Sequence, residues 1–563
     1  MVVALVVVPS CSALSDGGDG GSAAETTADA YLTAWAAGDV AAMSALVADP
    51  PADFATQQQG FRTGLQVVAA EATDVEVETS GDTGTASFRA ELGIQGVGTW
   101  AYDGALDLVE VDGEWRVAFT PASLHPALTE GTHLQRTRAQ GPRAAIVAAG
   151  GQPLAVGGPG EATRQDELAG ALVGQLRELS AAEAAQRGLE YAVGDLVGAD
   201  GAEAGYEDQL AGDPTGRIEV VDVAGRPVEV VHEFGGERPE PLRLTLDYAT
   251  QRAAEQAIAD VPLPVALVAI DSRTGAVRAV ANNPSGFDRA LLGEYAPGST
   301  FKIVTAAGVL AAGVEPEQVL PCPYETRFGD SAPFTNAFGE DYGDLPFIET
   351  FAKSCNTTFT TQGYQLGPAR LLEVAETFGF NQAYDLGVPS EFASFPLPES
   401  DTETGAASIG QGRVSVTPLH MASVAAAAYD GTWRPPYLSG EPPTEGSHEL
   451  PAPAREHLPE FLRSVVREGG TGVQAGILGR DIGGKTGTAE FGEEDPPETH
   501  AWFAGFIGEL AYALVVEGGG VGGEVAAPLV QDFLSLLPPP PVGPGEIEGF
   551  GEEPPTTTLP DGG

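Results

Sequence analysis

The sequence predicts a multidomain protein of the α+β class. Its 563 residues exceed what one hydrophobic core usually organises. Near the N-terminus, a helical pattern over 28–47 precedes several segments of alternating hydrophobicity, which indicate a small α+β domain. Further along, a helix-rich stretch from Ser299 to about 427 separates one predicted strand pair from three later strands. We therefore expect an antiparallel sheet split by a helical insertion in the C-terminal half.

The N-terminal part divides into a leader and a domain. Residues 1–23 form the leader. It contains an apolar run that ends at Cys11 and then a tether, rich in Gly, Ser and Asp, that runs from Ser12 to about residue 24. Residues 24–130 form the small α+β domain, in which Gly81-Asp82 and Asp112-Gly113 mark turns. The strands expected there are 75–79, 85–92, 98–108 and 115–119.

The rest of the chain divides into a middle domain, a C-terminal domain and a tail. Residues 140–243 predict short strands at 146–148 and 153–155, a helix over 166–189 and a hairpin over 218–231 around Gly225. Residues 538–563 are rich in Pro, Gly and Glu, and we expect a disordered tail. Residues 244–537 predict a helix at 248–259 and strands at 266–270, 276–280, 482–491, 500–507 and 511–516.

The net charge of −52 argues against nucleic acid as a partner, because both molecules would be polyanions. The spacing of the three cysteines and seven histidines matches no metal motif, so we expect no metal and no cofactor. Three cysteines and the apolar N-terminus indicate export, with Cys11 as a lipid-modified residue or with an anchor that precedes the sequence. Cys322 and Cys355 then form either a disulfide, which we expect, or two separate buried thiols.

A Ser-x-x-Lys motif lies where the helix-rich stretch begins. Pro297-Gly298 signals a turn, and the apolar run from Ile303 signals a buried helix, so Ser299 lies at a helix N-terminus. Free N–H groups there favour developing negative charge. Lys302 follows three residues later on the same helical face, and a desolvated lysine loses its proton readily and can act as a base.

Two later motifs make this pairing specific. Ser354-Cys355-Asn356 supplies Ser-x-Asn, and Lys485-Thr486-Gly487 supplies Lys-Thr-Gly, in that order along the chain. The chain contains only three lysines, of which two lie in the motifs and the third, Lys353, precedes the Ser-x-Asn. A chain that otherwise uses arginine and keeps lysine here favours a compact or deprotonatable cation at these positions.

This ordered triplet resembles that of the class B penicillin-binding proteins, the peptidoglycan D,D-transpeptidases. Over 244–537 the chain looks like their transpeptidase domain. The stretch from Arg143 to Gly150 resembles a degenerate form of the motif of their elongated pedestal, or dimerisation, domain. The segments 115–117 and 125–128 resemble the cone-shaped N-terminal domain of low-affinity, resistance-type members.

The resemblance implies an acyl transfer in which Ser299 attacks a D-Ala-D-Ala stem peptide and a neighbouring stem amine resolves the acyl-enzyme; β-lactams acylate the same serine. It implies that Lys302 is the base and Ser354 the proton relay. Asn356 hydrogen-bonds the amide of the acyl group's side chain, and Lys485 supplies positive electrostatic potential. Thr486, Gly487 and Thr488 form the strand that binds the substrate. The backbone N–H groups of Ser299 and Thr488 form the oxyanion hole.

Alternatives remain open at this point. A β-lactamase or D,D-carboxypeptidase uses water as acceptor, although a compact hydrolase does not need two further N-terminal domains. The non-enzymatic alternatives are a β-lactam sensor and a scaffold of a wall-synthesis complex. A scaffold would not need the three catalytic motifs, which are intact in this chain. We expect an extracytoplasmic, membrane-anchored enzyme whose partners are stem peptides, β-lactams and other wall-synthesis proteins.

Overall fold

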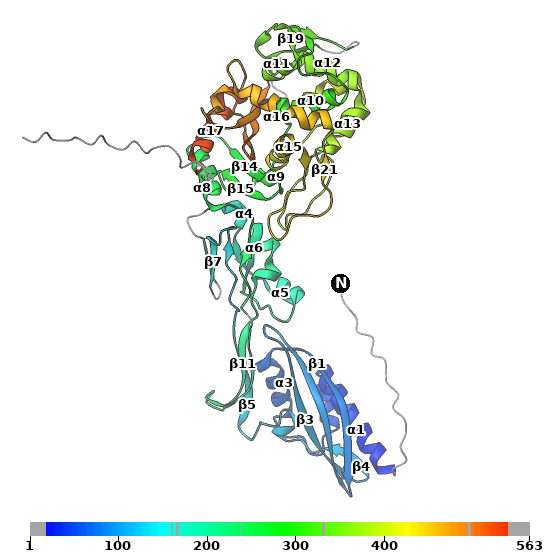
Figure 1. Ribbon diagram of the computed structural model, residues 1–563. Helices are drawn as coiled ribbons and strands as arrows, with labels where there is room; N and C mark the ends of the chain where they lie inside the picture. The colour runs from blue at the N-terminus through cyan, green and yellow to red at the C-terminus, as the bar shows by residue number, and fades with distance from the viewer. Residues whose placement is uncertain are drawn as a thin grey trace, which may run out of the picture. The chain divides into compact units, whose positions relative to one another are not determined.

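The computed structural model describes residues 19–158, 161–164, 168–236, 238–328, 333–492 and 497–538, so Cys11 and nearly all of the expected tail lie outside the described residues. The chain forms two compact units, each described by itself below (Figure 1). The first comprises Met1–Ile146, Ala155–Gln165 and Val173–Leu242, and the second comprises Val147–Leu154, Asp166–Leu172 and Arg243–Gly563.

The first unit begins with helices packed on a four-stranded antiparallel sheet of order β1-β2-β3-β4. The expected helix over 28–47 is two helices, because Gly38 adopts a left-handed backbone (φ 71°) and the Asp39 side chain caps the second. The tether prediction is wrong from Asp19 onward, where the first helix begins. The bounds are α1 (Asp19–Ala37), α2 (Val40–Ala45), α3 (Phe54–Leu65), β1 (Val67–Ser80), β2 (Thr83–Ile94), β3 (Gly98–Val111), β4 (Glu114–Val117) and η1 (Pro121–Ser123).

The remainder of this unit contains a three-stranded sheet of order β12-β11-β5 and smaller elements. The helix expected over 166–189 is wrong. Gly174 has φ 88° and ends a single helical turn, and Ser180 starts a separate helix through a capping box with Glu183. The bounds in the middle region are β5 (Thr132–Ala139), β6 (Ile146–Val147), β7 (Pro153–Gly158), β8 (Glu161–Arg164), α4 (Gly170–Val173), β9 (Leu176–Glu178), α5 (Ala181–Arg187), β10 (Leu196–Gly198), α6 (Gly201–Gly205), α7 (Glu207–Leu210), β11 (Thr215–Asp222), β12 (Pro227–Phe234) and β13 (Leu242–Arg243).

The second unit is built on a five-stranded antiparallel sheet of order β15-β14-β24-β23-β22. Helices α8 and α17 pack on one face and α15 on the other, so the central strands are buried on both sides (Figure 1). Strand β22 has a sheet neighbour on one side only and is the edge nearest the Ser-x-x-Lys motif. The bounds are α8 (Tyr248–Ile258), β14 (Val265–Asp271), β15 (Val277–Asn283), β22 (Ile482–Phe491), β23 (Glu498–Ile507), β24 (Leu510–Val516) and α17 (Gly522–Leu536).

The segment between β15 and β22 is the expected insertion, although it is not helical throughout: in its described part, the short strands β16 to β19 interrupt the helices between Val319 and Pro346. Within the described residues, none of the helices is both long and apolar enough to cross a bilayer. The bounds are α9 (Arg289–Leu292), η2 (Gly298–Phe301), α10 (Lys302–Ala311), β16 (Val319–Cys322), β17 (Glu325–Thr326), β18 (Phe334–Thr335), η3 (Ala337–Gly339), β19 (Gly343–Pro346), α11 (Phe347–Ala352), α12 (Asn356–Leu366), α13 (Pro368–Thr377), α14 (Asp401–Ala407), α15 (Pro418–Asp430), β20 (Thr432–Trp433), β21 (His448–Glu449), α16 (Ala452–Val466) and η4 (Val473–Ala475).

Candidate active site

Ser299 lies in the short 3₁₀ turn η2 that leads into α10, directly against the edge strand β22. Gly298, with φ 53°, allows this close approach, because a Cβ there would come within 2.6 Å of the Thr488 carbonyl oxygen. The Gly298 N–H also donates to the Gly410 carbonyl at 2.9 Å. The backbone segments that carry Ser299 and Thr488 are therefore held side by side.

Gly487 is a residue at which β22 packs tightly against the turn η2. A Cβ at this residue would lie 2.9 Å from the Thr300 methyl carbon and 3.0 Å from the Pro297 carbonyl oxygen. Any side chain would therefore push η2 away from β22. The glycine of the Lys-Thr-Gly motif sets the distance between the strand and the turn that carries Ser299.

Lys302 is fully buried, and its ammonium nitrogen contacts the second motif. Its Nζ lies 2.7 Å from the Ser354 carbonyl oxygen, 2.7 Å from Asn356 Oδ1 and 3.2 Å from Ser354 Oγ. Among the described residues no hydrogen bond joins Lys302 to Ser299. The lysine that the sequence places beside Ser299 is thus engaged with Ser354 and Asn356 in this structure.

Ser354 lies between the two motif lysines. Its Oγ is 2.8 Å from Lys485 Nζ and 3.2 Å from Lys302 Nζ. Its backbone is left-handed, with φ 58°, a conformation that costs a non-glycine residue about 1–2 kcal/mol. The hydrogen bond from Lys302 to the Ser354 carbonyl helps to offset this cost. One strained residue therefore presents both its carbonyl and its hydroxyl to the lysines.

Cys355 and Asn356 fix the other side of this motif. Cys355 is buried, caps the start of α12 and is joined to Cys322 of β16 by a disulfide with a Cα–Cα distance of 6.2 Å. Asn356 donates through Nδ2 to the Thr335 carbonyl at 2.9 Å, which leaves Oδ1 to accept from Lys302. The bridge between β16 and α12 thus anchors the residue between the two polar members of the motif.

The electrostatics of the two lysines are unusual. Both are fully buried, and in the described part of the chain neither has a carboxylate within 4.0 Å. Burial, the larger cause, and the charge of Lys485 lower the pKa of Lys302 well below its ordinary value. Burial alone lowers the pKa of Lys485 to about 7. The surroundings favour a neutral amine at Lys302.

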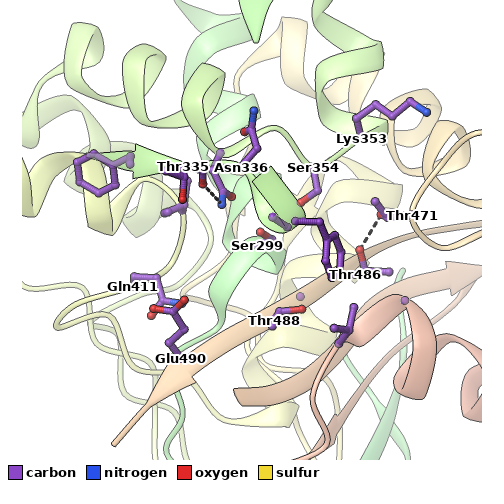
Figure 2. Close-up of a pocket in the computed structure, with 18 of the residues that line it drawn as sticks. Ser299, Thr335, Asn336, Lys353, Ser354, Gln411, Thr471, Thr486, Thr488 and Glu490 are labelled. Atoms are coloured by element: carbon purple, nitrogen blue, oxygen red, sulfur yellow. Dashed lines mark hydrogen bonds between the residues drawn. The ribbon is translucent and has the colours of Figure 1, made fainter. Parts of the chain in front are cut away.

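A cleft of ≈ 700 Å³ opens over these groups (Figure 2). Ser299, Ser354 and Asn356 line it together with Thr486, Gly487 and Thr488 of β22, whereas the two lysines lie beneath its surface. The Thr486 hydroxyl shares a 2.7 Å hydrogen bond with that of Thr471, and the Thr488 hydroxyl accepts from the Gly522 N–H at 3.3 Å. The structure thus brings all the predicted motif residues to one place.

Several lining residues were missed by sequence reasoning, and they come from separate loops. Glu490 continues the alternation Thr486, Thr488 on β22, so a period-two reading of the strand could have found it. The others carry no local signal; they are Thr335, Asn336, Phe338, Tyr342, Thr471, Gln474 and Glu524. Within the described residues, no group of three or more His, Cys, Asp or Glu side chains is arranged to hold a metal ion.

Comparison with known proteins gives the same reading of the domains. The family model "Penicillin binding protein transpeptidase domain" matches residues 265–535. "NTF2-like N-terminal transpeptidase domain" matches 23–132, and "Penicillin-binding Protein dimerisation domain" matches 163–244. The α+β class and the order of the three domains expected from the sequence are therefore confirmed.

Individual relatives are similar over part of their length. Peptidoglycan D,D-transpeptidase PbpA of Mycolicibacterium smegmatis is 36% identical over 43% of this chain and 55% of its own length. Peptidoglycan D,D-transpeptidase FtsI of Escherichia coli is 28% identical over 60% of this chain and 62% of its own. The chain thus spans a little over half the length of these curated relatives.

Solved structures extend the similarity over more of the chain. Pseudomonas aeruginosa PBP2 in complex with WCK 5153 is 25% identical, with a TM-score of 0.61 over 72% of this chain and 96% of that one. The D,D-transpeptidase domain of a peptidoglycan glycosyltransferase from Eggerthella lenta is 27% identical, with a TM-score of 0.56 over 71% and 98%. Each similarity thus covers about seven-tenths of this chain.

Proposed function

Because this chain belongs to the class B penicillin-binding protein family, we propose that it is a peptidoglycan D,D-transpeptidase that acts through an acyl-enzyme on Ser299. The observation that carries the proposal is the Ser354 hydroxyl, which two buried lysines share at 2.8 and 3.2 Å beside Ser299. Acyl transfer needs a nucleophile, a proton acceptor, an oxyanion pocket and a binding edge, and the cleft offers a candidate for each.

The hydrogen-bond arrangement supports Lys302 as the base. The Ser354 carbonyl and Asn356 Oδ1 have no proton to give, so Nζ must donate to both. A neutral amine has two N–H groups, and it satisfies both acceptors while keeping its lone pair. An ammonium would have no lone pair for the incoming proton. The contacts of Lys302 therefore suit the neutral form that a base requires.

The proposed reaction begins with attack by Ser299 Oγ on the carbonyl of the D-Ala-D-Ala bond. Its proton passes to Lys302, after the serine hydroxyl turns toward Nζ in the substrate complex. The tetrahedral oxyanion is bound by the N–H groups of Ser299 and Thr488, and one such donor is worth about 3–4 kcal/mol in other acyl transferases. Collapse breaks the C–N bond: Ser354 gives its proton to the departing D-alanine amine and takes up the proton held by Lys302, which returns the lysine to its neutral form.

The substrate carboxylate is bound at the Lys485 end of the site. Lys485 supplies positive charge beneath the strand, and the hydroxyls of Thr486 and Thr488 point along the cleft to hydrogen-bond a terminal carboxylate. Bringing that carboxylate in raises the protonated fraction of Lys485. A second stem peptide then attacks the ester through its amine, which forms the cross-link and releases Ser299. β-Lactams imitate the dipeptide and acylate the same serine.

Location, domain limits and partners belong to the same proposal. The protein acts outside the cytoplasm and is held at the membrane through a lipid on Cys11 or through a preceding anchor. The first domain starts with the helix at Asp19 and runs to 130, and the other two run over 140–243 and 244–537. Wall-synthesis proteins are its partners. Mass spectrometry of membrane-extracted protein tests the anchor: lipid mass on the peptide that contains Cys11 is expected, and an unmodified peptide with Met1 would contradict lipidation.

The test of the reaction is labelling with fluorescent penicillin. The unmutated chain is expected to be labelled, and Ser299→Ala is not. Incubation with a D-Ala-D-Ala donor and an amine acceptor should then give a cross-linked product. Only hydrolysed donor would instead identify a carboxypeptidase or β-lactamase, and absence of labelling would identify a non-catalytic scaffold.

A further inference from the structure

The edge strand β22 carries a third side chain into the cleft beyond the motif threonines. Thr486, Thr488 and Glu490 alternate along β22, and all three line the cleft. At about 3.3 Å per residue, Glu490 lies roughly 13 Å along the strand from Thr486. The cleft therefore extends past Ser299 to a carboxylate.

Glu490 is exposed to solvent, and among the described residues it forms no ion pair. Figure 2 draws Glu490 and Gln411 in the same part of the cleft, on the opposite side of Ser299 from Lys353. The Glu490 carboxylate therefore lines the cleft without an ion-pair partner among the described residues.

Gln411 is held firmly in relation to the nucleophile. Its N–H donates to the Ala406 carbonyl at 3.0 Å, and the preceding Gly410 accepts from the Gly298 N–H at 2.9 Å. A Cβ at Gly410 would lie only 2.2 Å from the Gly298 carbonyl oxygen, so this loop is packed against the turn before Ser299. The Gln411 backbone therefore has a defined place beside the turn that carries Ser299, and its side chain lines the cleft.

The direction of a bound donor follows from the sheet. Strand β22 runs from Lys485 toward Phe491, and a peptide that pairs antiparallel to its free edge runs the opposite way. A donor with its terminal carboxylate at Lys485 and Thr486, and its scissile carbonyl at Ser299, thus has its preceding residue at Glu490. The carboxylate of Glu490 and the carbonyl of Gln411 are two acceptors for a cation there.

We propose that Glu490, with Gln411, forms a subsite for a positively charged side chain on the donor residue that precedes the acyl D-alanine. This inference rests on the proposed function, because it takes the orientation of the donor from it. Donor and acceptor are both stem peptides. The amine with which a stem peptide acts as acceptor is therefore also present when that peptide acts as donor. Glu490 binds that ammonium and so favours donors whose amine has not yet been cross-linked.

A second carboxylate in the cleft provides a matched control. Glu524 also lines the cleft, but it lies in the first turn of α17, next to a glycine whose Cβ would be 2.5 Å from the Thr471 carbonyl oxygen. Thr471 bonds to Thr486, so Glu524 is near the carboxylate end of the site. If negative charge anywhere in the cleft favours a cationic donor, replacing either glutamate should reduce the preference for that donor. If Glu490 forms a subsite, only its replacement should do so.

The experiment compares two donors on the full chain, Nα-acetyl-L-Lys-D-Ala-D-Ala and its Nα,Nε-diacetyl form, by the release of D-alanine. The ratio of their kcat/KM values cancels any general loss of activity. We expect the unmutated chain to favour the free amine. Because exposed ion pairs are weak, Glu490→Gln should reduce the ratio about two- to fivefold, and Glu490→Lys should reduce it further. The preference should also shrink at high salt.

Glu524→Gln is expected to leave the ratio as in the unmutated chain. An unchanged ratio in both Glu490 variants, in a chain that penicillin still acylates, would overturn the subsite alone. Equal losses in the Glu490 and Glu524 variants would replace it by a general field effect. A chain that penicillin does not acylate at Ser299 would overturn the proposed function, and the subsite with it.

Discussion

The two units bury their cations in opposite ways. In the first unit, Arg143 is buried with Glu203 and Glu207, its Nε 2.6 Å from one carboxylate and its Nη2 2.9 Å from the other. In the second unit, Lys302 and Lys485 are buried more completely, and their described neighbours are neutral groups and aromatic rings. One arrangement compensates the charge within the protein, and the other leaves it uncompensated.

The contrast separates a structural site from a chemical one. An arginine between two carboxylates stays charged and joins the segments that carry it, and Glu207 is further satisfied by the Gly198 N–H at 2.9 Å. A buried lysine without a carboxylate loses its proton readily. In the proposed reaction the Lys302 amine is the base, and Lys485 is a cation that substrate can stabilise. Both proposed roles rely on burial without a counter-ion among the described residues.

The largest expected effect comes from replacing Lys302. Lys302→Arg keeps the positive charge but removes any accessible neutral form, so the acylation rate by fluorescent penicillin should fall about 10²–10⁴-fold, the usual contribution of a general base. Lys302→Met, which places no charge at this buried position, should lose as much activity while folding more readily than Lys302→Arg. Acylation by Lys302→Arg at nearly the unmutated rate would show that the lysine is not the base.

Replacing Arg143 should produce the opposite pattern. Arg143→Met strands Glu203 and Glu207, and breaking a buried ion pair costs about 3–5 kcal/mol. The loss should show as faster hydrogen exchange in α6 and α7, while the penicillin acylation rate of the folded protein stays unchanged. Adding Glu203→Gln and Glu207→Gln removes the stranded charges and should restore part of the protection. Unchanged exchange in the single variant would contradict a structural role.

The pH dependence of acylation tests both lysines together. Lys302 must be neutral, so the second-order rate should fall as pH drops through its lowered pKa. Lys485 must be charged, and since its pKa is about 7, the rate should fall up to tenfold per unit as pH rises above that value. Lys485→Arg keeps its proton and should abolish the alkaline fall but not the acid one. An alkaline fall that persists in this variant would assign it to another group.

Features that depend on the order of motifs could be predicted from the sequence, whereas contacts between distant residues could not. The motifs placed Ser299, Ser354 and Lys485 together because their order along the chain is itself informative, and the strand expected over 482–491 is β22 in the structure. The helix predicted over 166–189 failed because a positive φ at Gly174 depends on the neighbouring Asp200 backbone, 26 residues away, which no local pattern reveals. The hydrogen bond of Lys302 to Asn356 was missed because it joins residues 54 positions apart.

The smallest expected effect concerns Lys353, the third lysine. Its position beside Ser354 suggested, from lysine usage alone, that it shares the chemistry of the other two. The structure instead places it half-buried on the rim of the cleft, with Nζ 5.8 Å from the centre of the Tyr342 ring. Its charged end is therefore open to water, unlike those of the two fully buried lysines.

Lys353 thus tests whether burial, and not the choice of lysine, creates the reactivity. Lys353→Arg should acylate at close to the unmutated rate, and Lys353→Gln should lose at most about threefold, because an exposed charge attracts the penicillin carboxylate only weakly. The small loss should vanish at high salt, where exposed charges are screened. A hundredfold loss in Lys353→Gln that persists in salt would instead place this lysine with Lys302 and Lys485, and burial could no longer explain the difference between them.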